Sequence, residues 1–187
     1  RYLVTALVNN LVDTKLKIAV IIPTYKARNH ILDVINQIGS EVTRIYVVDD
    51  CCSYNSGDIV SSSCKDKRVS VIKHLENQGV GGAVITGYKA AIVEGMDILV
   101  KIDSDGQMDT ALIMDFVAPI IGCEADYTKG NRFYDIEKVR SMPKIRMFGN
   151  AVLSFMSKLS SGYWNIFDPT NGYTAIHADV AHQLPFN

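Results

Sequence analysis

Short apolar runs alternate along this chain with longer segments in which apolar residues recur at helical spacing. Runs rich in Ile, Leu and Val have the length and composition of strands buried on both faces of a parallel sheet, and they cover residues 17–22, 44–48, 68–72 and 97–102. Helical patterns cover residues 29–39, 79–94 and 110–121. This alternation predicts an α/β fold with a mostly parallel, doubly wound sheet flanked by helices.

Two further segments have the apolar spacing of amphipathic helices. In residues 2–16, a helix packed on the domain or on a partner copy is favoured over a membrane-surface helix, because few basic residues line the polar face. In residues 142–161 core packing is the default interpretation of the apolar stripe. A lipid-facing groove is the alternative, with Tyr163, Trp164 and Phe167 at its boundary.

The most informative stretch follows the apolar run at residues 97–102. Asp103 and Asp105 stand one residue apart, Gly106 permits a sharp turn, and Gln107 adds an amide oxygen. Such oxygen donors suit Mg²⁺ or Mn²⁺, and the carboxyl end of a parallel strand is where open α/β sheets bind ligands. The stretch indicates a nucleotide-diphosphate substrate, although an Asp-x-Asp pair alone is more often a solvated turn.

A calcium loop does not fit this stretch. Such a loop needs Asp or Asn at its fifth position, Gly at its sixth and Glu at its twelfth. Those positions hold Gln107, Met108 and Met114. The glycines at 79–87 also fail the dinucleotide fingerprint, and Tyr88 stands where a P-loop requires Lys.

Composition narrows the class of protein. With 187 residues, 48% apolar and 21% charged, the chain has the size and make-up of one globular domain. A net charge of −1 gives no electrostatic footprint for nucleic acid. Four cysteines without zinc-ligand spacing favour reduced thiols in a cytosolic compartment. No apolar stretch or signal peptide predicts a membrane span, and a C-terminal membrane segment beyond residue 187 remains an open alternative.

Several motifs occur in an order that is specific when taken together. They are Val20–Tyr25, Val47–Asp50, Asn77–Ala83, Asp103–Gln107, Lys129–Phe133, Arg146–Asn150 and Asp168–Tyr173. Over residues 18–176 this series resembles the family 2 glycosyltransferases, which are inverting enzymes of the GT-A (Rossmann-like) fold. The resemblance is greatest to the branch that contains dolichol-phosphate mannose synthase and bacterial polyprenyl-phosphate glycosyltransferases.

The resemblance implies a role for each matching position. Residues matching the segments that hold the base and ribose of the donor are Pro23, Tyr25, Asp49 and Asp50. Residues matching the metal ligands on the donor diphosphate are Asp103, Asp105 and Gln107. Arg132 matches an arginine near the phosphates, Arg146 and Asn150 match an acceptor-phosphate site, and Asp168 matches an acidic residue near the reaction centre.

This sequence departs from the family pattern on the nucleotide side. Lys26-Ala27 stands where the family often has Asn-Glu, and Cys51-Cys52 stands where it often has Gly-Ser. These departures leave the identity of the donor base undetermined. They do not affect the predicted metal and phosphate chemistry.

The sequence predicts a single GT-A domain over residues 1–187, with residues 1–16 as an N-terminal amphipathic extension. The expected reaction is inverting transfer of a sugar from a GDP- or UDP-linked donor to a polyprenyl phosphate, with Mg²⁺ or Mn²⁺, at the cytoplasmic face of a membrane. Alternatives are transfer to a hydroxyl of a surface polysaccharide or glycolipid, and a nucleotide-binding module without turnover. A homo-oligomer is a further open alternative.

Overall fold

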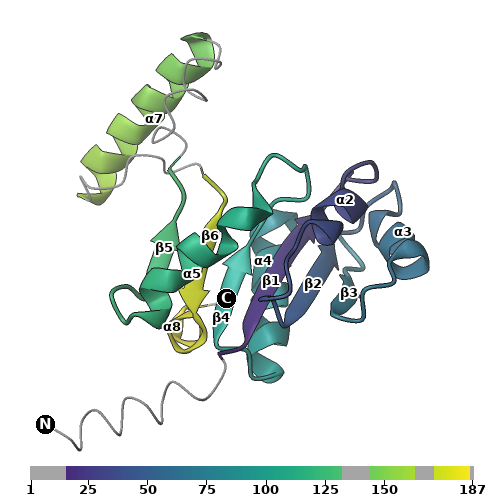
Figure 1. Cartoon of the computed structure of the whole chain (residues 1–187). Helices are drawn as coiled ribbons and strands as arrows, with labels where there is room; N and C mark the ends of the chain where they lie inside the picture. Colours follow the sequence, from purple (N-terminus) through teal and green to yellow (C-terminus); the bar gives the residue numbers. More distant parts are fainter. Residues whose placement is uncertain (1–15, 132–143, 163–170, 186–187) are drawn as a thin grey trace, which may run out of the picture.

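The computed structural model describes residues 16–131, 144–162 and 171–185. In these ranges six strands form one sheet, in the order β3-β2-β1-β4-β6-β5 (Figure 1). The parallel part consists of β1 (Ile18–Thr24), β2 (Arg44–Asp49), β3 (Val69–Lys73) and β4 (Ile98–Lys101). At the other edge β6 (Thr174–His177) runs antiparallel to β4 and to β5 (Tyr127–Lys129). The predicted mostly parallel α/β sheet is confirmed.

Alternate residues of the strands face two apolar layers, one on each side of the sheet. Ile18, Val20 and Ile22 of β1 face a layer formed with α2 (Ile31–Asn36), α3 (Ser56–Ser63) and α5 (Ile113–Ile121). Ala19 and Ile21 of β1 face the layer formed with α4 (Gly79–Val93) and α8 (Ala178–Gln183). Burial on both faces is why these strands read as continuous apolar runs.

Helix α4 lies very close to the sheet because its contact face is built from small residues. A Cβ atom at Gly87 would overlap the side chain of Ile21, and Ala83 and Ala91 are fully buried. This close approach brings the first turn of α4 to the carboxyl ends of the strands. The predicted helix over residues 79–94 is thus confirmed within one residue.

Other predicted helices are shorter than their patterns. Helix α2 spans only residues 31–36 of the predicted 29–39, and the guanidinium of Arg68 holds the carbonyls of Ile38 and Val42 in the loop that follows. The predicted helix at 110–121 begins as a 3-10 turn, η1 (Thr110–Leu112), because the Asp109 carboxylate accepts from the backbone N–H of Ala111. The hydrophobic pattern did not predict α3, β5, β6 or α8.

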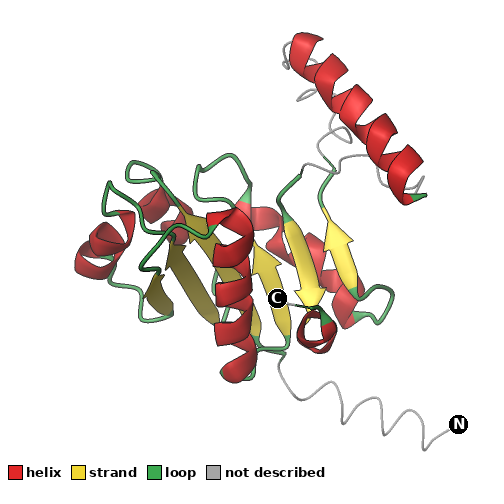
Figure 2. Ribbon diagram, turned by 180° about the vertical axis from the view of Figure 1, so that it is seen from behind, coloured by secondary structure: helices red, strands yellow, loops and turns green. Residues whose placement is uncertain are grey.

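Helix α7 (Lys144–Ser161) stands beyond β5, apart from the sheet and its covering helices (Figure 2). The apolar side chains of this helix that the structure describes are exposed, namely Val152, Leu153, Phe155, Met156 and Leu159. For these residues the core-packing interpretation is wrong, and the lipid-facing alternative stays a prediction. Among the described residues no helix has the length and apolar character needed to cross a membrane. The predicted N-terminal helix lies outside the described residues.

Candidate active site

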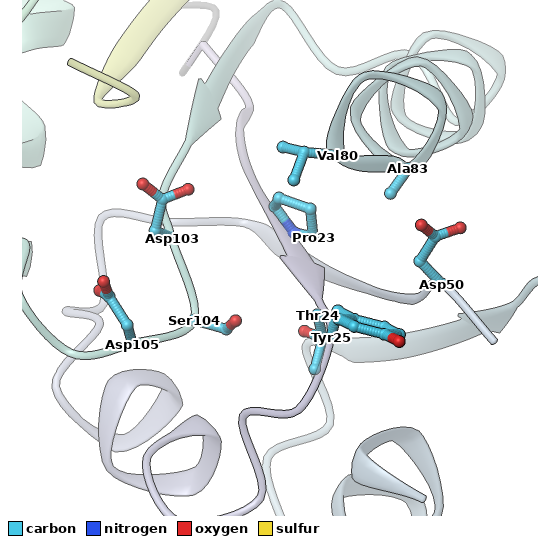
Figure 3. Close-up of a pocket in the computed structure, with 9 residues that line it drawn as sticks. All are labelled: Pro23, Thr24, Tyr25, Asp50, Val80, Ala83, Asp103, Ser104 and Asp105. Carbon is cyan, nitrogen blue, oxygen red and sulfur yellow. The ribbon is translucent and has the colours of Figure 1, made fainter. Parts of the chain in front are cut away.

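A pocket of about 200 Å³ opens at the carboxyl ends of β1, β2 and β4. It lies where the strand order reverses, since β2 and β4 flank β1 on opposite sides, and such a switch point is the usual ligand site of open α/β sheets. Its lining residues are Pro23, Thr24, Tyr25, Asp50, Val80, Ala83, Asp103, Ser104 and Asp105. Asp103 and Asp105 lie on one side of the pocket and Asp50 on the other, with Pro23 and Tyr25 between them (Figure 3).

Asp103 directly follows Ile102 at the end of β4, and it is half-buried. Its carboxylate forms an ion pair with the ammonium group of Lys101, a residue that is 8% exposed. The two side chains lie beside the backbone of Gly172, where a Cβ atom would stand 2.7 Å from Oδ2 of Asp103. A buried charge needs a partner, so Lys101 and Asp103 stabilise each other at this edge of the pocket.

Asp105 and Gln107 form the turn after β4. Oδ1 of Asp105 accepts a hydrogen bond of 3.0 Å from the backbone N–H of Gln107, and Gly106 has a φ of 75°, which glycine adopts without strain. Both Asp105 and Gln107 are exposed, and Asp105 lines the pocket, whereas Gln107 is not among the lining residues.

The two carboxylates fit a divalent ion. Among the described residues no group of three His, Cys, Asp or Glu side chains gathers to hold a metal. Asp103 and Asp105 nevertheless supply hard oxygen donors at an open pocket. Mg²⁺ is typically bound by one or two carboxylates together with substrate phosphates and waters. Two protein carboxylates are therefore enough for such an ion, because the substrate and water supply the remaining ligands.

The adjacent residues Asp49 and Asp50 have different surroundings. Asp49 is buried away from the pocket, and its two oxygens accept hydrogen bonds of 2.8 Å and 2.6 Å from the backbone N–H groups of Cys52 and Gly57. Asp50 lines the pocket. Asp49 therefore stabilises the loop before α3. Of the two aspartates, only Asp50 lies where it can contact a ligand.

Hydrogen bonds keep the Asp50 carboxyl ionised. Burial raises its pKa, but the backbone N–H groups of Gln78 and Gly79 and the ring of His74 outweigh that effect, and the pKa lies below its usual value. The backbone N–H of Gln78 donates to Oδ1 over 2.8 Å, and the Asn77 amide donates to the backbone carbonyl of Asp50 over 3.2 Å. The Asn-Gln-Gly part of the motif at 77–83 thus wraps around Asp50.

The two departures from the family pattern contact each other. The backbone N–H of Lys26 donates to Sγ of Cys52 over 3.0 Å, and the Lys26 ammonium group lies 5.1 Å from the centre of the Tyr25 ring. Burial raises the pKa of the Cys52 thiol, while hydrogen bonds from Ser56, Lys26 and Tyr54 outweigh burial and lower it. The changes in the first and second motifs therefore form one local arrangement beside Tyr25. All four cysteines are free.

Two later motifs meet beside Asp103. The backbone N–H of Gly130 donates to the carbonyl of Tyr173 over 2.9 Å. The Tyr173 ring stacks on Phe116 with centroids 4.1 Å apart, and its hydroxyl donates to the backbone carbonyl of Asp109 over 3.1 Å. These contacts join the ends of the Lys129–Phe133 and Asp168–Tyr173 motifs to the region after β4.

The remaining predicted residues are not all placed. Arg132 and Asp168 lie outside the described residues. Arg146 and Asn150 belong to α7, but their side chains also fall outside the described part of the chain. In Figure 1, α7 stands apart from the six-stranded sheet.

The sequence reasoning missed Lys101 and His74, which both adjoin the pocket residues. The ring of His74 is only 6% exposed and contacts Asp50. The sequence could have placed His74 near the site, because this residue directly follows β3 and adjacent parallel strands bring their carboxyl ends together. Lys101 could have been noticed as a charged residue inside a run expected to be buried.

Comparison with known proteins agrees with this arrangement. The model of the Glycosyl transferase family 2 matches residues 19–184. The UDP-N-acetylglucosamine–dolichyl-phosphate N-acetylglucosaminyltransferase of Methanococcus voltae is 33% identical over 172 residues, which cover 84% of this chain and 68% of that protein. The undecaprenyl-phosphate mannosyltransferase of Micrococcus luteus is 27% identical over 172 residues, which cover 90% of this chain and 70% of that protein.

Solved structures share the fold. Glucosyl-3-phosphoglycerate synthase from Mycobacterium tuberculosis, crystallised with Mn²⁺, UDP and phosphoglyceric acid, superposes with a TM-score of 0.66 at 17% identity over 88% of this chain. The chain spans only 57% of that synthase. The order of motifs, the GT-A sheet with its pocket at the switch point, and the match over residues 19–184 agree on one assignment: the chain belongs to glycosyl transferase family 2.

Proposed function

We propose that this enzyme transfers a sugar with inversion from a nucleoside-diphosphate donor to a polyprenyl phosphate, using Mg²⁺ or Mn²⁺. The observation that carries the proposal is the division of the pocket, with Asp103 and Asp105 on one side and Asp50 and Tyr25 away from them. A nucleoside diphosphate has the same division, because its diphosphate needs a cation while its base needs apolar contact and a hydrogen-bond partner.

Tyr25 and Asp50 suit the nucleoside end of the donor. Tyr25 is 47% exposed and lines the pocket, so a flat base can stack on its ring. Asp50 is an ionised acceptor on the same side. Val80 and Ala83, from the first turns of α4, leave apolar surface between them and the strand ends.

Asp103 and Asp105 suit the diphosphate end. A divalent ion held there, with Gln107 as a further ligand, would neutralise the charge that develops on the departing diphosphate. Lys101 forms an ion pair with Asp103 and orients its carboxylate. Arg132 is proposed to contact the phosphates, since a guanidinium binds two phosphate oxygens at once.

The acceptor class is proposed from the relatives. Proteins named as transferases to dolichyl or undecaprenyl phosphate match most of this chain, and the exposed apolar side chains of α7 suit contact with a lipid or a membrane surface. In the proposed step an acceptor phosphate oxygen bonds to the anomeric carbon from the side opposite the leaving group. The bond from that carbon to the diphosphate breaks, and the nucleoside diphosphate leaves with the electron pair. Arg146 and Asn150 are proposed to hold the acceptor phosphate, with Asp168 near the reaction centre.

Calorimetric titration with UDP and GDP, with and without Mn²⁺, tests the donor half of the proposal. Binding of one of them that requires the ion is the expected result. Release of nucleoside diphosphate from UDP- and GDP-sugars, with sugar label recovered on a polyprenyl phosphate, tests the acceptor half. Binding without release or label transfer would instead identify a nucleotide-binding module, and no binding at all would contradict the proposal.

A further inference from the structure

A buried chain of hydrogen bonds lies behind the pocket face of Asp50. Nδ1 of His74 is 2.7 Å from Oδ1 of Asp50, and Nε2 of His74 is 2.8 Å from the hydroxyl of Thr86 on α4. The side chains of His74 and Asp50 are 6% and 4% exposed. This one imidazole joins three segments of the chain: the end of β2, the end of β3 and the second turn of α4.

The direction of these hydrogen bonds follows from the chemistry of Asp50. An ionised carboxylate can only accept, so Nδ1 of His74 carries a proton and donates it. In the neutral ring Nε2 is then an acceptor, and the Thr86 hydroxyl donates to it. Thr86 thereby fixes the ring orientation that His74 needs to reach Asp50.

These contacts leave Asp50 with little freedom. The backbone N–H of Asp50 donates to the carbonyl of Thr24 over 3.1 Å, and Oδ1 of its carboxylate is held by both His74 and Gln78. Both of these bonds end on Oδ1, so neither of them engages Oδ2, and Asp50 lines the pocket. A carboxylate held at one oxygen presents the other in a fixed direction.

We infer that His74 and Thr86 are positioning residues that aim Oδ2 of Asp50 at a ring N–H of the donor base. This inference rests on the proposed function. It names the chemistry of the base: N3–H of uracil and N1–H of guanine are donors, whereas cytosine and adenine present a ring lone pair at the corresponding position. The donor base is therefore uracil or guanine, and His74 contributes to its selection without touching it.

A purely structural role for His74 makes a different prediction. If the imidazole only filled space between β3 and α4, its loss would weaken every nucleotide equally. If it acts through Asp50, its loss must weaken nucleotides that have the ring N–H more than those that lack it. Methylation of that nitrogen, in N3-methyl-UDP or N1-methyl-GDP, removes the donor and leaves the phosphates unchanged, so the ratio of the two affinities separates the roles.

The experiment measures Kd values by calorimetry, with Mn²⁺, for UDP, GDP and their two N-methyl analogues. The variants are His74→Leu, which removes both hydrogen bonds, Thr86→Val, which keeps the shape of the side chain, and His74→Asn, whose amide can still donate toward Asp50. Lys73→Met is the matched control, because it changes the preceding residue of β3 and breaks only an exposed ion pair with Asp58.

The wild type should bind UDP or GDP about 10-fold more tightly than its methylated analogue, the size expected for a hydrogen bond to a charged acceptor. His74→Leu should lose most of that preference, Thr86→Val part of it, and His74→Asn less than His74→Leu. The double variant His74→Leu/Thr86→Val should lose no more than His74→Leu, because both act through one chain. Lys73→Met should keep the preference.

Equal loss of affinity for a nucleotide and its methylated analogue would overturn the inference, as would a wild type that does not distinguish them. If His74→Leu does not fold, Thr86→Val and His74→Asn still decide the question. Absence of any nucleoside-diphosphate binding by the wild type would instead contradict the proposed function, and the inference would fall with it.

Discussion

The backbone of Gly172 lies against the carboxylate of Asp103, so closely that a Cβ atom at Gly172 would stand 2.7 Å from Oδ2 of Asp103 and would also overlap the ammonium group of Lys101. Residue 172 precedes β6, which pairs with β4. The chain therefore returns to the proposed metal site just after the segment that contains Asp168. A side chain at position 172 cannot be accommodated without displacing the Lys101–Asp103 pair.

We expect Gly172→Ala to weaken Mn²⁺-dependent nucleotide binding about 10-fold, or roughly 1.4 kcal/mol, because Asp103 must move. The fold should persist, since overpacking typically costs only about 1–3 kcal/mol. Calorimetry with UDP or GDP measures the first effect and urea unfolding the second. Gly122→Ala is the control, as a Cβ atom there meets its nearest atom at 3.4 Å, far from the pocket. Unchanged binding in Gly172→Ala would contradict the prediction that a side chain at position 172 displaces Asp103 from a metal site.

Asp105→Ala should abolish the dependence of nucleotide binding on the divalent ion. Without this carboxylate, phosphate charge would face Asp103 with less compensation, so affinity in Mn²⁺ should fall to the value measured with a chelator. The thermal midpoint should change little, because Asp105 is exposed. Asp179→Asn, which removes a carboxylate on α8, should behave like the wild type. Equal affinity of the wild type with and without the ion would contradict the metal assignment.

The contacts of Arg68, which lies remote from the pocket, are expected to stabilise the fold. Its guanidinium donates to Asp66 over 2.7 Å, to the carbonyl of Ile38 over 3.0 Å and to the carbonyl of Val42 over 3.2 Å. Arg68→Met should lower the free energy of unfolding by about 2 kcal/mol, because several acceptors lose their donor. Lys73→Met, which breaks an exposed ion pair, should cost only ~0.5 kcal/mol.

The same contact sets a pH dependence. The hydrogen bond from Arg68 lowers the pKa of Asp66 below its usual value. A carboxyl with a lower pKa in the folded state contributes stability above its unfolded pKa, and the contribution is lost as the pH falls through the folded pKa. Unfolding curves should therefore show a smaller difference between wild type and Arg68→Met below about pH 4 than at pH 7. A difference independent of pH would mean that the pair with Asp66 contributes nothing.

The sequence predicted the parallel half of the sheet and the residues at its carboxyl edge, for one physical reason. Strands buried on both faces need long apolar runs, so β1, β2 and β4 can be recognised in the sequence as apolar runs that end in polar residues. Because these strands are parallel, the polar residues that follow them lie at the same edge of the sheet. Asp50, Asp103 and Asp105 were found in this way. Short strands such as β5 and β6 carry no such run, and their pairing depends on contacts across the fold.

Other features arise from tertiary contacts that no local pattern encodes. The distinction between Asp49 and Asp50 depends on the backbone N–H groups of Cys52 and Gly57, which reach only Asp49. The position of His74 depends on Thr86, twelve residues later on another element. Exposure of the apolar stripe on α7 is likewise a matter of what packs against it.

Arg132→Lys tests the proposed phosphate contact. Lysine keeps the positive charge but loses the planar pair of donors that fits two phosphate oxygens. Turnover should fall on the order of 10-fold, while the circular dichroism spectrum and the thermal midpoint stay unchanged. Sugar-transfer assays at saturating donor measure the effect. A variant with wild-type turnover would show that Arg132 forms a surface ion pair instead.

Asp168→Asn separates the two acceptor classes, because a lipid phosphate is already an anion whereas a hydroxyl must lose a proton. The substitution keeps shape and hydrogen bonding but removes basicity. With a phosphate acceptor we expect a modest loss of rate and no rate-limiting deprotonation near neutral pH. With a hydroxyl acceptor, loss of a general base should cost about 10²–10⁴-fold.

Label transfer to a polyprenyl phosphate and to glycan hydroxyls, measured across pH for wild type and Asp168→Asn, gives both rates. Transfer to the lipid phosphate that survives the substitution is the expected result. Efficient transfer to a glycan hydroxyl, lost in Asp168→Asn and absent with lipid phosphate, would reassign the acceptor. The donor half of the site, which depends on Asp50, Asp103 and Asp105, would be unaffected by that outcome, since the nucleoside diphosphate leaves in either reaction.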